Sequence, residues 1–113
     1  MAQITREQAA TEALTDIVRR EVKAYEVGGF GGRLISVLDD SQGRYALHIL
    51  VDKPEPNPVR TVMLAEVIGD YVIIQTDRTD KPLVDALMVN GGIPRDKIVL
   101  AYAGETLPAP TDS

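Results

Sequence analysis

The sequence predicts one α+β domain, with an N-terminal helix, a four-stranded antiparallel meander, a second helix and a short C-terminal strand. The 113 residues, of which 44% are hydrophobic, suit a single packed core. Apolar side chains recur every three or four residues near both ends of the chain and every second residue between them. Short turn sequences join the strand-like runs, which favours antiparallel neighbours. We expect one domain over 1–113, with flexible termini at 1–5 and 104–113.

Helical spacing predicts the first helix at about 6–27. Its apolar positions are Ala10, Leu14, Ile17, Val18, Val22 and Tyr25. Thr5 is suited to cap the helix, with Gln8 reaching back in a capping box. The glycines at 28–32 are predicted to end it. Because these glycines follow a helix and precede a strand, their context is the reverse of a dinucleotide-binding loop.

Four strands are predicted, at 34–38, 45–52, 59–68 and 71–77. Polar turn residues at 39–43 join the first two, and Gly69-Asp70 joins the last two as a hairpin in which the glycine supplies a positive φ. Three prolines lie in 53–58, and proline lacks a backbone donor, so this segment is predicted to be an exposed loop.

The second helix is predicted to begin at a cap formed by Thr79 or Asp80, with Pro82 in its first turn. Leu83 and Leu87 share one face of that helix.

Asn90-Gly91-Gly92 is predicted to end the second helix, and Pro94 prevents it from restarting. Ile98-Val99-Leu100 then has the length of a short strand. A sheet of this kind needs one face covered, and the two amphipathic helices are the available cover.

The bulk composition narrows the function classes. The chain has 17 acidic and 12 basic residues, a net charge of −5, which disfavours autonomous nucleic-acid binding. It has no cysteine, which excludes disulfides and thiolate metal sites and fits a cytoplasmic location. No apolar run approaches the roughly 18 residues of a membrane span, and no signal-peptide pattern is present, so no membrane contact is predicted.

Few side chains are candidates for chemistry. His48 is the single histidine, and a structural or surface role is favoured because no second histidine completes a metal triad. Asp77 and Asp80, near Gln75, Thr76 and Thr79, suit a cation or a basic side chain, but capping is favoured because a calcium site needs about six oxygens. Neither Ser36 nor Ser41 has the context of a nucleophile. We therefore predict no catalytic residue, no metal and no cofactor.

The stretch from residue 71 to residue 102 resembles the XisI family. Tyr71-Val72-Ile73-Ile74-Gln75-Thr76-Asp77, with Thr79-Asp80, is similar to the family pattern KIWIQ-D-TE, and Gly92 to Tyr102 is similar to GVPKEDIVLGF. The layout is similar over most of residues 8–102, with the specific motifs in 71–102. The matching positions are Tyr71, Ile74, Gln75, Asp77, Thr79, Asp80, Gly92, Pro94, Asp96, Ile98, Val99 and Leu100.

The chain departs from the family at three places. It ends in Gly104-Glu105-Thr106-Leu107-Pro108-Ala109-Pro110, where the family has an R-x-Y-T stretch. Ile73 stands where the fourth strand usually has a tryptophan, and a second family tryptophan near Val51 is missing. These differences bear on any terminal or aromatic contact.

The resemblance implies a controlling factor for the excision of a DNA element, with the fdxN element as the namesake. Such proteins resemble accessories of a site-specific recombinase and are often found with XisH, which resembles small nucleases. The resemblance supplies no catalytic residues.

The expected function is that of a non-enzymatic accessory protein, with an XisH-like protein or a recombinase as partner and DNA touched only indirectly. Its acidic balance suits a basic, DNA-acting partner. A homo-oligomer is also expected, because strand edges seek pairing or cover. One alternative is direct DNA binding by Arg33, Arg44, Arg60 and Arg95. A second is a small metal-assisted enzyme that uses Asp77 and Asp80.

Overall fold

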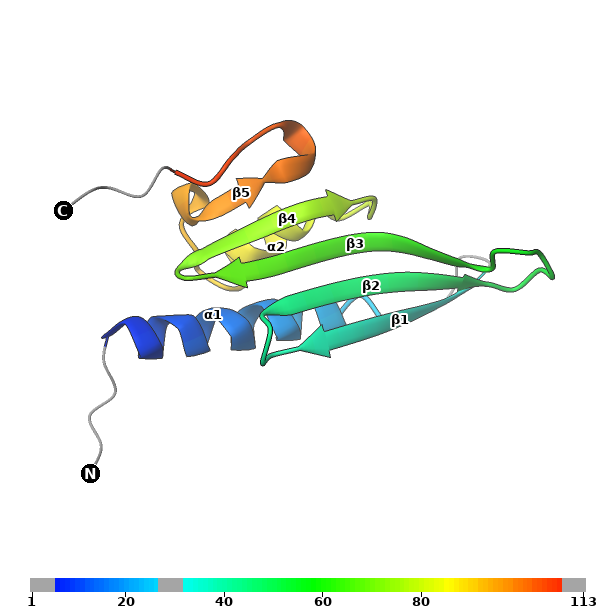
Figure 1. Cartoon of the computed structure of the whole chain (residues 1–113), viewed down its shortest axis with the longest axis horizontal. Coiled ribbons are helices and arrows are strands. Elements are labelled where there is room, and N and C mark those ends of the chain that lie inside the picture. Colours follow the sequence, from blue (N-terminus) through cyan, green and yellow to red (C-terminus); the bar gives the residue numbers. More distant parts are fainter. Residues whose placement is uncertain (1–5, 27–31, 109–113) are drawn as a thin grey trace, which may run out of the picture.

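The computed structural model describes residues 6–26 and 32–108, with the side chains of the first helix from Leu14 onward (Figure 1). Two helices and five strands make up the fold. Their bounds are α1 Arg6–Lys23, β1 Gly32–Asp39, β2 Arg44–Val51, β3 Val59–Ile68, β4 Tyr71–Asp77, α2 Leu83–Val89 and β5 Ile98–Leu100. Short 3₁₀ turns at Arg95–Lys97 and Ala101–Ala103 flank β5.

The strands form one sheet in the order β1-β2-β3-β4-β5. The first four pair antiparallel, which confirms the predicted meander. The fifth strand pairs parallel to β4, with Val72 beside Ile98 and Ile74 beside Leu100. The parallel pairing follows from α2, which carries the chain back to the starting end of β4 before β5 begins.

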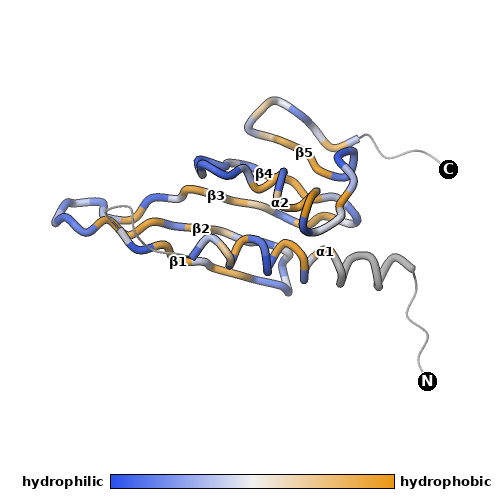
Figure 2. The backbone as a smooth tube through the Cα atoms, turned by 180° about the vertical axis from the view of Figure 1, so that it is seen from behind, coloured by the Kyte–Doolittle hydropathy of each residue, from blue (hydrophilic) through white to orange (hydrophobic). Residues whose placement is uncertain are grey.

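Both helices pack on the same face of the sheet, as predicted (Figure 2). The opposite face, toward the reader in Figure 1, carries no helix. The buried cluster joins the apolar stripes of α1 and α2 to the inward side chains of the sheet, and its fully buried members include Val18, Val22, Tyr45, Leu47, Met63, Val72, Ile74, Leu83 and Leu87. Alternate residues of each strand supply this core.

The helix and strand ends differ in part from the expected ones. The bounds of β3, β4 and β5 are those predicted, whereas β1 is longer at both ends and β2 begins and ends one residue earlier. Helix α1 ends at Lys23, before the expected residue 27, and Tyr25 closes a turn by donating its N–H to the Val22 carbonyl. The predicted cap at Thr5 and the glycines at 28, 29 and 31 lie outside the described residues.

Glycine is required at two kinds of position. Gly69 has a φ of 60°, which confirms the predicted hairpin turn between β3 and β4. At Gly91 the reason is proximity, since a Cβ there would lie 2.5 Å from Cγ2 of Ile17. Helix α2 therefore ends in direct contact with α1, and Asn90 strengthens the contact by donating to Glu21, 3.0 Å away.

At each edge of the sheet, the carboxylate of a glutamate accepts a hydrogen bond from a backbone N–H that points away from the sheet. At the β1 edge, Ser36 donates its N–H to Glu26 Oε1 over 2.9 Å. At the β5 edge, Leu100 donates its N–H to Glu105 Oε1 over 3.0 Å, and the N–H of Glu105 donates back to the Leu100 carbonyl over 3.1 Å. Residue 105, within the segment expected to be a flexible tail, is thus tied to β5. Such contacts blunt the pairing capacity of edge strands.

Candidate functional site

Asp77, the last residue of β4, organises the connection to α2. One carboxylate oxygen accepts the N–H of Thr79 over 2.9 Å and lies 2.6 Å from its hydroxyl. The other accepts the N–H of Leu83, the first residue of α2, over 2.7 Å. Both oxygens are therefore committed to backbone donors at the start of the helix.

The expectation that Thr79 or Asp80 caps α2 was wrong. Pro82 occupies the N-cap position and provides no side-chain hydrogen bond, so it also lies just before the helix and not in its first turn. The cap comes from Asp77, six residues upstream of the donor at Leu83. Thr79 instead supports Asp77, and Asp80 is exposed.

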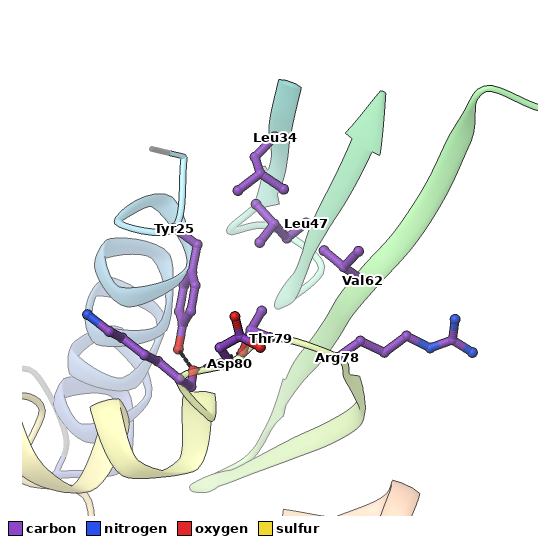
Figure 3. A pocket seen from close by; sticks show the side chains of 8 residues that line it. Tyr25, Leu34, Leu47, Val62, Arg78, Thr79 and Asp80 are labelled. Carbon is purple, nitrogen blue, oxygen red and sulfur yellow. Dashed lines mark hydrogen bonds between the residues drawn. The ribbon is translucent and has the colours of Figure 1, made fainter. Parts of the chain in front are cut away.

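A cleft opens where α1 ends beside this connection. Its volume is about 400 Å³, and its floor is the inward face of β1–β3, formed by Leu34, Leu47 and Val62. In Figure 3 the ring of Tyr25, from the turn that follows α1, faces these side chains, whereas Arg78 extends away from them. The remaining lining residues, all from the β4–α2 connection, are Thr79, Asp80 and Lys81.

The polar groups that line the cleft make hydrogen bonds that stabilise the fold. The Tyr25 hydroxyl donates to the Lys81 carbonyl, and burial raises the pKa of Tyr25. A tyrosine that remains protonated and engaged in this way is a poor general base. The cleft is thus an apolar hollow with a fixed polar rim.

A second, shallower hollow follows the outer surface of α2. It encloses about 380 Å³, and Asp80, Asp85 and Val89 are among its lining residues. Val89 is 82% exposed, and its neighbour Met88 is 38% exposed. We call Asp80, Asp85, Met88 and Val89 the α2 surface. It combines two exposed carboxylates with two exposed apolar side chains. Lys81 lines the same hollow, so the charged lining residues leave an acidic excess of one, which suits a basic partner.

The positions that match the XisI motif are spread along the β4–α2–β5 unit. Asp77, Thr79 and Asp80 meet at the helix start, and Ile74, Ile98 and Val99 are buried. Gln75 donates to Glu66 over 3.0 Å, and Lys97 lies over the ring of Tyr71, 4.7 Å from its centre. Leu100 belongs to β5, while Gly92, Pro94 and Asp96 shape the chain that leads into it.

The four arginines of the DNA-binding alternative lie apart. Three have acidic partners, at 3.7 Å for Arg44 and Glu66, 2.7 Å for Arg60 and Glu55, and 2.6 Å for Arg95 and Glu105. Arg33 has no ion pair within residues 6–26 and 32–108. His48 lies half-buried on the helix-free face, with Nδ1 3.0 Å from the Thr61 hydroxyl.

Two further features of the described chain bear on function. The described residues contain no group of three or more His, Cys, Asp or Glu side chains arranged to hold a metal ion. Neither described helix has the length and apolar character that crossing a membrane requires.

Sequence reasoning missed Tyr25 as a cleft wall, Glu26 and Glu105 as edge contacts, and the α2 surface. The first three depend on contacts between distant residues, for which the sequence carries no signal. The α2 surface did leave one: Met88 and Val89 are apolar but lie outside the stripe made by Leu83 and Leu87.

Comparison with known proteins shows which fold and which family the chain shares. Two solved structures from Anabaena variabilis ATCC 29413 share the fold. One, the fdxN element excision controlling factor XisI, has a TM-score of 0.67 and 15% identity, with 82% of this chain and 86% of that chain covered. The other, a XisI-like protein, has a TM-score of 0.60 and 20% identity, with 81% and 83% covered. A comparison with curated proteins gives no match. The family model described as XisI protein matches residues 2–112, and the chain belongs to this family.

Proposed function

We propose that this protein is a non-enzymatic accessory factor in the excision of a DNA element and that it acts through contacts with a basic, DNA-acting protein. Membership of the XisI family, matched over residues 2–112, carries the proposal, together with the description of the Anabaena relative as an excision controlling factor. The partner expected from the family resemblance is an XisH-like protein or a recombinase. The proposed setting is the cytoplasm.

The charge of the chain supports a protein partner over a nucleic acid. A chain of net charge −5 is repelled by phosphates, whereas it attracts the basic surface of a DNA-acting protein. Direct DNA binding has less support, because three of its four candidate arginines are already paired with glutamates. A metal-assisted reaction at Asp77 has less support too, because both oxygens of that carboxylate already accept hydrogen bonds.

The α2 surface is the contact that we propose for this partner. Val89 supplies exposed apolar area, and Asp80 and Asp85 beside it supply the charge that attracts a basic surface. Interfaces of this kind combine an apolar centre with a polar rim.

Co-purification tests the proposal. A tagged XisH-like protein is expected to retain this chain at low and moderate salt. Val89→Lys, which replaces the most exposed apolar side chain of the α2 surface with a cation, is expected to weaken retention at least about tenfold. Val37→Lys serves as the matched control, because Val37 is another exposed valine, 53% accessible, on the opposite side of the sheet. If the wild-type chain is not retained at either salt concentration, the pairing is wrong.

A further inference from the structure

We infer that the helix-free face of the sheet is a contact between two copies of this chain, stacked face to face about a twofold axis. We call the outward side chains of β1, β2 and β3 the open face. The inference deepens the self-association expected from the sequence. Its test uses the isolated chain, so its failure would leave the proposed docking of a DNA-acting protein intact.

The open face carries more apolar side chains than the solvated face of a sheet normally does. An antiparallel sheet with one wet side usually alternates apolar-in and polar-out. Here the cross-strand register places Val37, Ala46 and Leu64 in one row on the outward side. A second row joins Arg33 to Leu50 and Val59, and the row between these two holds Ile35 with the hydrogen-bonded pair His48 and Thr61. Val37 and Val59 are 53% and 52% exposed, so this apolar surface lacks a cover within the described chain.

The edges of the sheet are poor alternatives for association. Glu26 already accepts the outward N–H of Ser36 on β1, and Glu105 accepts that of Leu100 on β5. A strand that added to either edge would displace a carboxylate and bring its own carbonyls against it. On the face itself, Ile73 of β4 and Val99 of β5 are already buried, which leaves the three strands β1–β3 as the accessible part.

The charge of the open face selects a second copy as its occupant. Arg33 lies at one end of the face, and the row of Asp39, Arg44 and Glu66 lies at the other. These four charges cancel, whereas the whole chain carries −5. Two copies of so acidic a chain repel each other, and the balanced charges of the open face add nothing to this repulsion.

The two ends are also complementary to each other. Stacked sheets lie about 10 Å apart with strands aligned to within about 30°. A twofold axis in the interface, crossing the strands between the Ile35 and Val37 rows, reverses the strand direction of the second copy. Arg33 of each copy then lies over Asp39 of the other, and the Val37–Ala46–Leu64 row of each copy lies over the Ile35–His48–Thr61 row of the other. One surface patch thus serves both copies, as twofold symmetry requires.

Light scattering combined with size-exclusion chromatography is the first measurement. The wild-type chain is expected to show twice the 12.3 kDa mass of one copy, with dissociation on dilution. Val37→Lys places two cations near the axis and is expected to raise the dimer dissociation constant at least about tenfold. Val89→Lys, the matched control on the other side of the sheet, is expected to remain dimeric.

A second pair of variants tests the charge arrangement. Arg33→Glu is expected to weaken the dimer about tenfold, whereas Arg33→Lys, which keeps the charge, is expected to match the wild type. Circular dichroism and thermal melting would establish that every variant is folded.

Cross-linking tests the geometry without disturbing it. The chain has no cysteine, so Val37→Cys introduces a single thiol near the axis. A bis-maleimide with a spacer of about 10 Å, the sheet separation, is expected to link two copies through this thiol, and not through Val89→Cys. A monomeric wild-type chain, a folded Val37→Lys variant that stays fully dimeric, or cross-links through position 89 alone would overturn the inference.

Discussion

At the scale of single residues, Asp77 does most to shape the family motif. Its carboxylate ends β4, starts α2 and holds Thr79, which in turn lies 2.8 Å from the Lys81 carbonyl. That carbonyl also accepts a hydrogen bond from the hydroxyl of Tyr25, in the turn that follows α1. One aspartate therefore links the sheet to both helices. Asp77 therefore has a structural role in the motif, because both of its carboxylate oxygens accept hydrogen bonds within the chain.

Asp77→Ala is expected to lower the free energy of unfolding by about 1–2 kcal/mol, because the N–H groups of Thr79 and Leu83 lose their acceptor. Asp80→Ala removes an exposed carboxylate with no hydrogen bond to the described residues. This substitution is expected to change the free energy of unfolding by less than about 0.5 kcal/mol. Urea titration of both variants measures the two values. A loss at Asp80 as large as that at Asp77 would restore Asp80 as the cap.

At the scale of elements, each of the two edge strands has a backbone N–H that donates to a glutamate carboxylate. The N–H of Ser36 lowers the pKa of Glu26, assisted by Lys23. Arg95 lowers the pKa of Glu105, assisted by the N–H of Leu100. In both cases the interaction favours the charged carboxylate. Protonation of Glu26 and Glu105 at low pH would therefore weaken the contacts that cover the edge strands.

The sign of this pH dependence follows from the lowered pKa values. A carboxylate whose pKa is lower in the folded state contributes stability above its ordinary pKa of 4.5, and the contribution is lost as the pH falls through the folded value. The melting temperature of the wild type is expected to fall below about pH 4.5, and that of Glu26→Gln or Glu105→Gln to fall less steeply. Asp80→Asn serves as the control and should follow the wild type. Parallel curves for all four proteins would contradict the assignment.

At the scale of the whole molecule, the sheet separates two surfaces of different character. The α2 surface lies on the helix side and carries exposed acids, and the open face lies on the other side with balanced charges. The layer of helices packed on one face, with α1 and α2 side by side, sets this division (Figures 1 and 2). A partner on one surface therefore leaves the other accessible.

The two contacts are expected to be separable. Val37→Lys should be monomeric and still bind the XisH-like partner, whereas Val89→Lys should be dimeric and fail to bind it. Light scattering on the purified complex should give two copies of this chain with the wild type and one with Val37→Lys. Loss of both contacts in one folded variant would show that the surfaces overlap and would contradict the division.

Much of this fold is legible in the sequence because the signals are local. The bounds of β3, β4 and β5 follow from turns such as Gly69-Asp70, where a glycine with positive φ sits between two β-branched runs. The end of α1 was harder to predict: Tyr25 continues the apolar spacing, yet its ring faces the cleft from beyond the last helical turn. Periodicity predicts which side chains are apolar, but it does not show where tertiary contacts replace helical ones.

The sequence by itself determined the fold class, the order of the elements and the family resemblance, because each depends on spacing within a few residues or on a short motif. Only the tertiary structure decided that Asp77 caps α2, that β5 lies parallel to β4, and that Glu26 and Glu105 close the edges. The same holds for the open face, where Arg33 and Glu66 are 33 positions apart in the chain and share one surface through the β1–β2–β3 register. Contacts between distant residues arise from packing the whole chain, and packing also decides which faces remain uncovered.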